Sequence, residues 1–128
     1  MHDFLTVGAA APLQEAAVTA LDFPADYYEE LLEIYTRKRD LFLGYLKQTG
    51  LPYTIPQGAY YTLVDISSLG YANDRLAAEE LTKKIGVTGV PGSSFFREAV
   101  HCYIRFHFAK KDDTLQRAGE RIAAGLRG

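Results

Sequence analysis

The sequence has little of several features that mark common functional classes. It contains one cysteine, Cys102, so no internal disulfide can form, which fits a reducing compartment such as the cytoplasm. No apolar run approaches the ~20 residues that a membrane helix needs. No block of like charge occurs in a chain with a net charge of −2, so a nucleic-acid-binding surface is not indicated. The first residues lack the basic and apolar regions of a signal peptide.

Motifs for metal binding and for nucleophilic catalysis are also missing. The histidines are His2, His101 and His107, and no cysteine or second ligand pair joins them at metal-binding spacing. The sequence has no Gly-x-Ser-x-Gly segment, and no Gly-Lys-Ser/Thr follows the Pro91–Gly92 turn. The sequence therefore predicts no metal site, and its residues alone indicate no catalytic group.

What is present is an alternation of helical and extended patterns in 128 residues, 48% of them hydrophobic, which is enough chain for one core. Hydrophobic spacing predicts helices over residues 13–21, 26–49 and 74–85 and a closing helix, with strands over 59–66, 87–90 and 102–109 and an extended segment over 51–56. Asp74 and an aspartate before the closing helix are the expected caps, and Gly86 is the expected helix end. This order favours an α+β two-layer sandwich, with helices on one side of a small, mostly antiparallel sheet.

The strand over 102–109 carries the most informative residue, Arg105. Alternation places Cys102, Ile104, Phe106 and Phe108 on one face and Tyr103, Arg105 and His107 on the other. An arginine among large apolar residues is costly unless an anion meets it, and its planar guanidinium suits a carboxylate held by two parallel hydrogen bonds. The residues alone leave two interpretations open: an anion-binding site, or the commoner structural pair with an acidic residue of the fold.

Four segments in this order resemble segments of the class I/II, fold-type I aminotransferases. They are Phe4–Gly8 with Pro12 and Gln14, Pro56-x-Gly58-Ala59-Tyr60-Tyr61, Val90-Pro91-Gly92-Ser93-Ser94-Phe95, and Tyr103-Ile104-Arg105-Phe106-x-Phe108-Ala109. Together they cover nearly the whole chain, and they are similar to the C-terminal part of aspartate, kynurenine and methionine aminotransferases.

The resemblance implies a domain organisation and a site. Residues 25–128 would form the C-terminal small domain, and residues 1–24 would be a remnant of the large domain with a linker, which fits the abrupt apolar start of the chain. The full-length enzyme would be a homodimer that uses pyridoxal 5′-phosphate to transfer an amino group from an amino acid to a 2-oxo acid. Arg105 would bind the substrate α-carboxylate, and the expected cleft-lining residues are Gly58, Ala59, Tyr60, Tyr61, Pro91, Gly92, Ser93 and Ser94.

The sequence departs from the family pattern in one respect that bears on activity. The family's Schiff-base lysine lies in a Ser-x-x-Lys context, and no lysine of this chain has one. We therefore expect the chain alone to hold no pyridoxal phosphate and to be inactive without the N-terminal cofactor-binding domain of the same protein. The same fold type includes lyases and synthases that use the same arginine. The alternative from another class is a free-standing α+β module that binds an anion or regulates without catalysis.

Overall fold

The computed structural model describes residues 10–126. The chain divides into two compact units, residues 1–33 and 34–128, and the boundary falls inside helix α3 (Ala25–Lys47). The domain limit predicted from the sequence, between residues 24 and 25, stays a prediction, since the two units meet between residues 33 and 34. The segment Phe4–Gly8, which carries part of the resemblance, lies outside the described residues.

The first unit consists of helix α2 (Ala11–Leu21) and the first part of α3. Pro12 occupies the first turn of α2, where its missing N–H costs nothing. No residue of α2 is buried, and the side chains of Leu13 and Leu21 are 70% and 80% exposed. Within residues 10–126 no helix is long and apolar enough to cross a membrane. Among residues 10–33, nothing buries the apolar side chains of α2.

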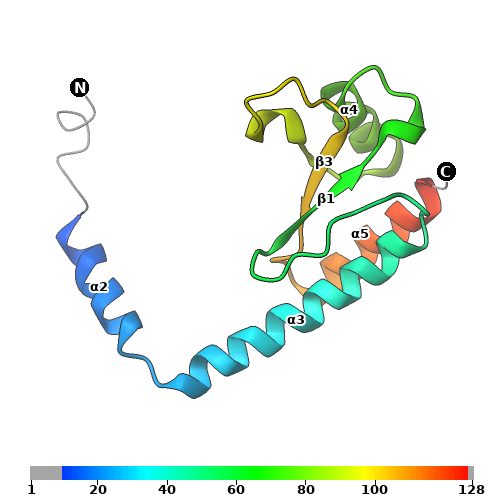
Figure 1. The fold of residues 1–128 in the computed structure, drawn as a ribbon. Coiled ribbons are helices and arrows are strands. Elements are labelled where there is room, and N and C mark those ends of the chain that lie inside the picture. The colour runs from blue at the N-terminus through cyan, green and yellow to red at the C-terminus, as the bar shows by residue number, and fades with distance from the viewer. Residues whose placement is uncertain (1–9, 127–128) are drawn as a thin grey trace. The chain divides into compact units, whose positions relative to one another are not determined.

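The second unit is built on an antiparallel sheet of three strands, β1 (Tyr61–Asp65), β2 (Val90–Pro91) and β3 (Tyr103–His107), in the order β1-β3-β2. Figure 1 shows β1 and β3 side by side. Two predicted strands are confirmed in shorter form, whereas the strand expected over 87–90 forms only at 90–91. The reason lies at Gly89, whose backbone packs so closely on Ile104 and Phe106 that a Cβ would lie 2.2 Å from the Ile104 side chain.

The outer edge of β1 is covered by the segment that the sequence predicted to be extended. Tyr53 forms an isolated antiparallel bridge with Val64. On either side of this bridge, the Thr54 N–H donates to the Leu63 carbonyl at 2.9 Å, and the Asp65 N–H donates to the Pro52 carbonyl at 2.8 Å. The segment is thus paired with β1 without being long enough to count as a strand.

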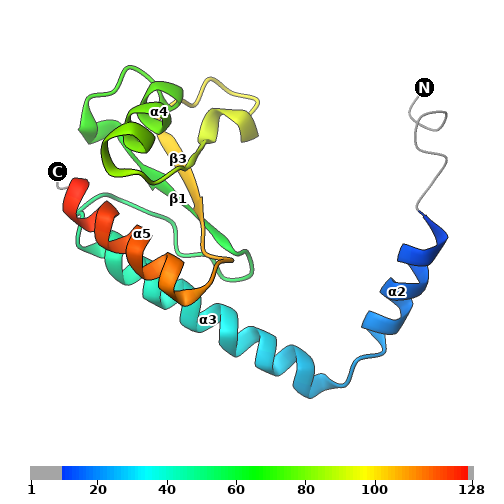
Figure 2. The same cartoon turned by 180° about the vertical axis from the view of Figure 1, so that it is seen from behind.

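Helices α3, α4 (Asp74–Ile85) and α5 (Asp112–Gly125) bury one face of the sheet. Val64 and Ile104 of the sheet are 0% exposed, and they belong to the same core cluster as residues of all three helices, including Leu46, Leu81 and Ile122. Figure 2 shows the sheet and these helices from behind. The predicted α+β two-layer sandwich, with helices on one side of the sheet, is confirmed.

The two aspartates expected to cap helices do something else. Asn73 caps α4, because its side chain accepts the Leu76 N–H at 2.9 Å. Asp74 is instead the first residue of that helix and is completely buried. Gly86 ends α4 in the left-handed conformation, with φ of 67°, as predicted.

At the start of α5 the N-cap position belongs to Lys111, whose side chain makes no capping hydrogen bond. Asp112, the first helical residue, accepts from the Lys38 ammonium at 2.8 Å and the Arg37 guanidinium at 3.2 Å. These contacts lower the pKa of the exposed Asp112 carboxyl, chiefly through the Lys38 hydrogen bond. The pair joins the start of α5 to α3.

Candidate functional site

The face of the sheet that the helices leave uncovered carries the candidate site. Alternate residues of the two longer strands point to it, and none of them is buried: Tyr61, Leu63 and Asp65 of β1, and Tyr103, Arg105 and His107 of β3. Arg105 lies at the centre of this open face, because its Cα is paired with Leu63 on one side and with Val90 on the other. The alternation predicted from the sequence for β3 is confirmed.

The Arg105 guanidinium lies against two aromatic rings. Its central carbon is 4.0 Å from the centre of the Phe95 ring and 5.1 Å from that of Tyr61. Rings at these distances attract a cation through their negative faces and restrict its orientation. Among residues 10–126 no hydrogen bond or ion pair to the Arg105 side chain is found. Its N–H groups therefore remain available for a carboxylate, and the described part of the chain offers no acidic partner for the structural interpretation.

The first group of expected cleft residues lies at the start of β1. Tyr61 begins the strand and reaches Arg105, while Tyr60 precedes it with a ring that is 56% exposed. The Tyr60 carbonyl accepts the Phe108 N–H at 2.9 Å, which holds this segment to the end of β3. Gly58 and Ala59 lie before Tyr60 in irregular backbone. Of this group, the structure brings Tyr61 into contact with Arg105.

The second group lies on β2 and the 3₁₀ turn Gly92–Phe95 that follows it. Pro91 belongs to the strand, and Gly92 approaches β3 so closely that a Cβ would lie 2.8 Å from the Tyr103 carbonyl oxygen. Ser93 donates its N–H and its hydroxyl to Asp74, and Ser94 is exposed. No side chain caps this turn.

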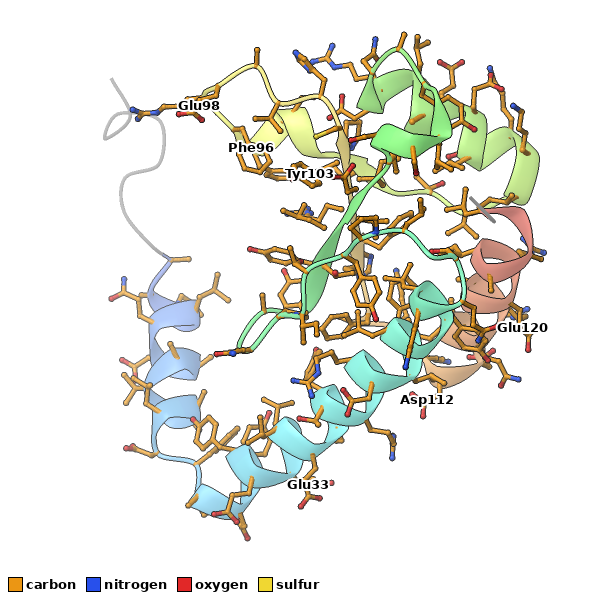
Figure 3. All side chains as sticks on the ribbon, turned by 45° about the vertical axis from the view of Figure 1, so that its right-hand side comes forward. Glu33, Phe96, Glu98, Tyr103, Asp112 and Glu120 are labelled. Atoms are coloured by element: carbon orange, nitrogen blue, oxygen red, sulfur yellow. The ribbon has the colours of Figure 1, made fainter. Side chains whose placement is uncertain are left out.

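Sequence reasoning missed two residues of this site as individual candidates. Phe95 was part of the quoted segment, but nothing in the sequence indicated that its ring would lie on Arg105. Figure 3 shows that the next residue, Phe96, lies close to Tyr103, with ring centres 6.2 Å apart. The second missed residue is Asp74, which follows Asn73 at a helix start, where either residue can cap. The sequence offers no signal for which of the two turns inward.

The charge on the open face comes from Arg105 rather than from its neighbour His107. Partial burial lowers the pKa of the His107 imidazole, and the positive charges of Lys110 and Arg105 lower it further. His107 is therefore uncharged at neutral pH. Within residues 10–126 no three His, Cys, Asp or Glu side chains gather to hold a metal ion.

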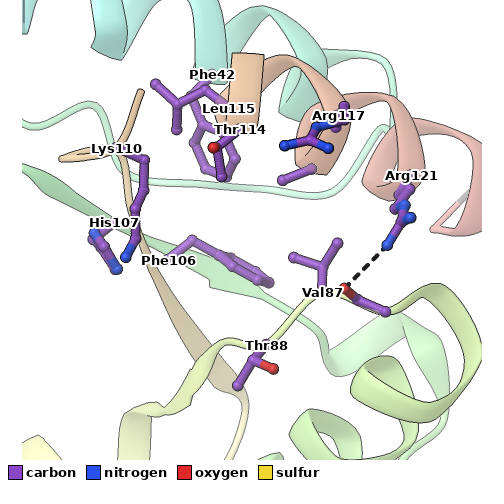
Figure 4. Close-up of a pocket in the computed structure, with 12 residues that line it drawn as sticks. Phe42, Val87, Thr88, Phe106, His107, Lys110, Thr114, Leu115, Arg117 and Arg121 are labelled. Carbon is purple, nitrogen blue, oxygen red and sulfur yellow. Dashed lines mark hydrogen bonds between the residues drawn. The ribbon is translucent and has the colours of Figure 1, made fainter. Parts of the chain in front are cut away.

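A second concave feature, of about 320 Å³, lies between β3 and α5 (Figure 4). It is lined by Phe42, Val87 and Phe106 and by three cations, Lys110, Arg117 and Arg121. Both arginines are already engaged, because Arg117 pairs with Asp113 at 3.3 Å and Arg121 donates to the Gly86 carbonyl at 3.5 Å. Arg105 is therefore the stronger candidate for binding an anion.

The open face suits a carboxylate better than it suits pyridoxal phosphate. An imine to the cofactor needs a lysine amine, and the residues that β1 and β3 direct to this face include no lysine. Lysines 38 and 83 make short ion pairs elsewhere, with Asp112 at 2.8 Å and Glu79 at 2.7 Å. The open face thus supplies a guanidinium and aromatic rings, and it offers no amine to form the imine.

Comparison with known proteins places this geometry in a family. The model for "Aminotransferase class I and II" matches residues 1–122. The chain is 34% identical to kynurenine–oxoglutarate transaminase of Dictyostelium discoideum, over 94% of this chain and 33% of that protein. It is 33% identical to methionine aminotransferase of Escherichia coli K12, over 95% of this chain and 32% of that one. The fold matches N-succinyldiaminopimelate aminotransferase from Mycobacterium tuberculosis with a TM-score of 0.81 at 30% identity, over 95% of this chain and 32% of that one. The chain thus spans about a third of the length of these relatives.

Proposed function

Because this chain belongs to the class I and II aminotransferases, we propose that its open sheet face is the part of an aminotransferase active site that binds the substrate α-carboxylate. In this proposal two N–H groups of Arg105 donate in parallel to the two carboxylate oxygens. The observation that carries the proposal is that the guanidinium is stacked on Phe95 and Tyr61 and has no hydrogen-bond or ion-pair partner among residues 10–126.

The reaction class explains why one arginine suffices. Transamination moves an amino group from an amino acid to a 2-oxo acid, and both molecules carry a carboxylate directly on the carbon that loses or gains the amino group. Arg105 fixes that carboxylate and so orients the reacting carbon, which is a contribution of positioning rather than of bond making. The pyridoxal phosphate supplies the electron sink and is held, in this proposal, by the N-terminal domain of the same protein.

The domain assignment is part of the same proposal. Residues 25–128 form the small domain, and residues 1–24 belong to the large cofactor-binding domain of a homodimeric enzyme. The uncovered apolar side chains of α2 support this, because exposed patches of that kind are typical of surfaces that pack against another part of an assembly. A cytoplasmic location stays a prediction based on the single cysteine, and cell fractionation tests it.

The test is kinetic and uses the native protein that contains this stretch. Replacing the guanidinium in Arg105→Gln is expected to lower kcat/KM by about 10²- to 10³-fold for both the amino acid and the 2-oxo acid. Arg105→Lys keeps the charge but loses the planar fork, and it is expected to recover only part of the activity. Arg75→Gln, an exposed arginine on α4, is the matched control. An Arg105→Gln enzyme that keeps half or more of its kcat/KM contradicts the proposal.

The alternative function is a free-standing module that binds an anion without catalysis, since an unpaired Arg105 also fits that role. The intact mass of the native protein separates the two. A chain about three times as long, with a Ser-x-x-Lys upstream, supports the aminotransferase assignment. A native chain that ends near 128 residues supports the binding module. Product analysis with the full enzyme then distinguishes a transaminase from a lyase or synthase.

A further inference from the structure

Asp74 makes contacts that its position at a helix start does not require. Its side chain is completely buried, and the usual role of an aspartate there, capping, is filled by Asn73. One carboxylate oxygen of Asp74 accepts the Ser93 N–H at 2.6 Å, and the other accepts the Ser93 hydroxyl at 3.0 Å. The His101 imidazole nitrogen lies 4.0 Å from the second oxygen. A buried carboxylate on α4 thus binds a loop residue nineteen positions later.

The loop that Asp74 holds is the one that carries Phe95 to Arg105. Ser93 lies in the 3₁₀ turn Gly92–Phe95, so fixing its backbone fixes the turn. Gly92, the residue before it, is pressed against Tyr103 of β3. The turn is therefore held on two sides, by a hydrogen-bonded carboxylate and by backbone contact, and the Phe95 ring that leaves it lies 4.0 Å from the Arg105 guanidinium.

We propose that Asp74 is a positioning residue for the carboxylate site: through Ser93 it holds the Phe95 ring on Arg105 and so sets the orientation of the guanidinium. Charge-assisted hydrogen bonds that a buried carboxylate accepts are short and directional, which suits this role. The proposal rests on the function proposed above for Arg105 as the carboxylate-binding residue. Asp74 touches no substrate and acts through Ser93 and Phe95.

The test follows the side-chain N–H signal of Arg105 by ¹⁵N NMR in the full 128-residue chain, with Arg105→Gln to assign it. An aromatic ring over a guanidinium shifts this signal, so the signal reports the stacking directly. The variants are Asp74→Asn, which removes the charge, Ser93→Ala, which removes the hydroxyl hydrogen bond, and Phe95→Leu, which removes the ring. Glu79→Gln, on the exposed side of the same helix, is the matched control. Sodium acetate is the carboxylate probe, and sodium chloride at the same ionic strength is its control.

Asp74→Asn and Phe95→Leu are expected to move the Arg105 signal to the position of an unstacked arginine and to weaken acetate binding about three- to tenfold. Ser93→Ala is expected to give a smaller change of the same sign, and Glu79→Gln none. A folded Asp74→Asn chain with an unmoved Arg105 signal overturns the proposal. If Asp74→Asn does not fold, an unmoved signal in Ser93→Ala overturns it instead.

The failure of the positioning role and the failure of the proposed function give different results. If acetate leaves the wild-type Arg105 signal unchanged while Asp74→Asn shifts it, Asp74 positions Arg105 but the carboxylate-binding function is wrong. If acetate binds equally to wild type and Asp74→Asn, Arg105 binds carboxylate without help from Asp74, and the positioning proposal is wrong.

Discussion

The two faces of strand β3 differ in almost every physical property. The inner face presents Ile104 and Phe106, which are 0% and 3% exposed and packed under three helices. The outer face presents Arg105 and His107, which are not buried, and the Arg105 guanidinium lies beside the rings of Phe95 and Tyr61. Because successive side chains of a strand alternate, adjacent residues serve separate purposes. The comparison teaches that the buried core and the open face proposed to bind a carboxylate are separated here by one residue step, so they can be altered independently.

The largest effect on stability is expected from Ile104→Ala on the inner face. Removing most of a completely buried side chain leaves a cavity and is expected to lower the free energy of unfolding by about 2–5 kcal/mol. Urea unfolding followed by circular dichroism measures the change. Carboxylate binding by the fraction that remains folded should be unaltered. A loss below about 1 kcal/mol would mean that the core refills around the cavity.

A smaller loss is expected from Gly119→Ala, which tests how tightly the inner layer is packed. A Cβ at this position on α5 would lie 2.2 Å from Cδ2 of the Tyr45 ring and 2.4 Å from its Cγ, so the helices must separate. Overpacking of this kind is expected to cost about 1–3 kcal/mol. Alanine is otherwise the better helix former by about 1 kcal/mol. A more stable variant would therefore show that Tyr45 moves aside freely. Thermal unfolding of Gly119→Ala and wild type shows whether the substitution lowers or raises the stability.

On the outer face, Arg105→Gln is expected to leave stability nearly unchanged and to abolish carboxylate binding, which is the reverse of the expectation for Ile104→Ala. Since Arg105 has no hydrogen-bond or ion-pair partner among residues 10–126, its replacement is expected to change the free energy of unfolding by no more than about 0.5 kcal/mol. The same substitution should abolish the acetate-dependent shifts of neighbouring amide signals. If the variant unfolds as easily as Ile104→Ala, Arg105 is a structural residue and the contrast between the faces fails.

The smallest effect concerns pH and His107. Its pKa is lowered in the folded chain, so as the pH falls the unfolded chain takes up the proton first, and the folded state is disfavoured below the ordinary histidine pKa of about 6.5. Wild type is therefore expected to lose more stability than His107→Gln between pH 7.5 and pH 5.5. Unfolding midpoints of the two chains at both values measure the difference. If both chains lose the same amount of stability, the pH dependence arises from a titrating group other than His107.

The sequence predicted those parts of the fold that depend on local pattern. The alternation in β3, the helix end at Gly86 and the layering of helices on one face follow from spacing and from glycine's tolerance of positive φ. The third strand was misplaced because the contact of Gly89 with Ile104 is made between distant segments. The stacking of Phe95 on Arg105 and the hydrogen bond from Ser93 to Asp74 are likewise contacts between segments far apart in the sequence. The spacing of hydrophobic residues along the sequence does not predict such contacts.

The cover over the outer edge of β1 also bears on how this domain behaves in a crowded solution. A bare strand edge is a template on which another chain can add a strand, and this is a common start of aggregation. Here Pro52 and Thr54 already use the hydrogen-bonding groups of Asp65 and Leu63. At the opposite edge, β2 is only two residues long and ends in Pro91, which has no N–H to donate. The sheet can therefore keep the face that carries Arg105 uncovered without offering its edges to neighbouring chains.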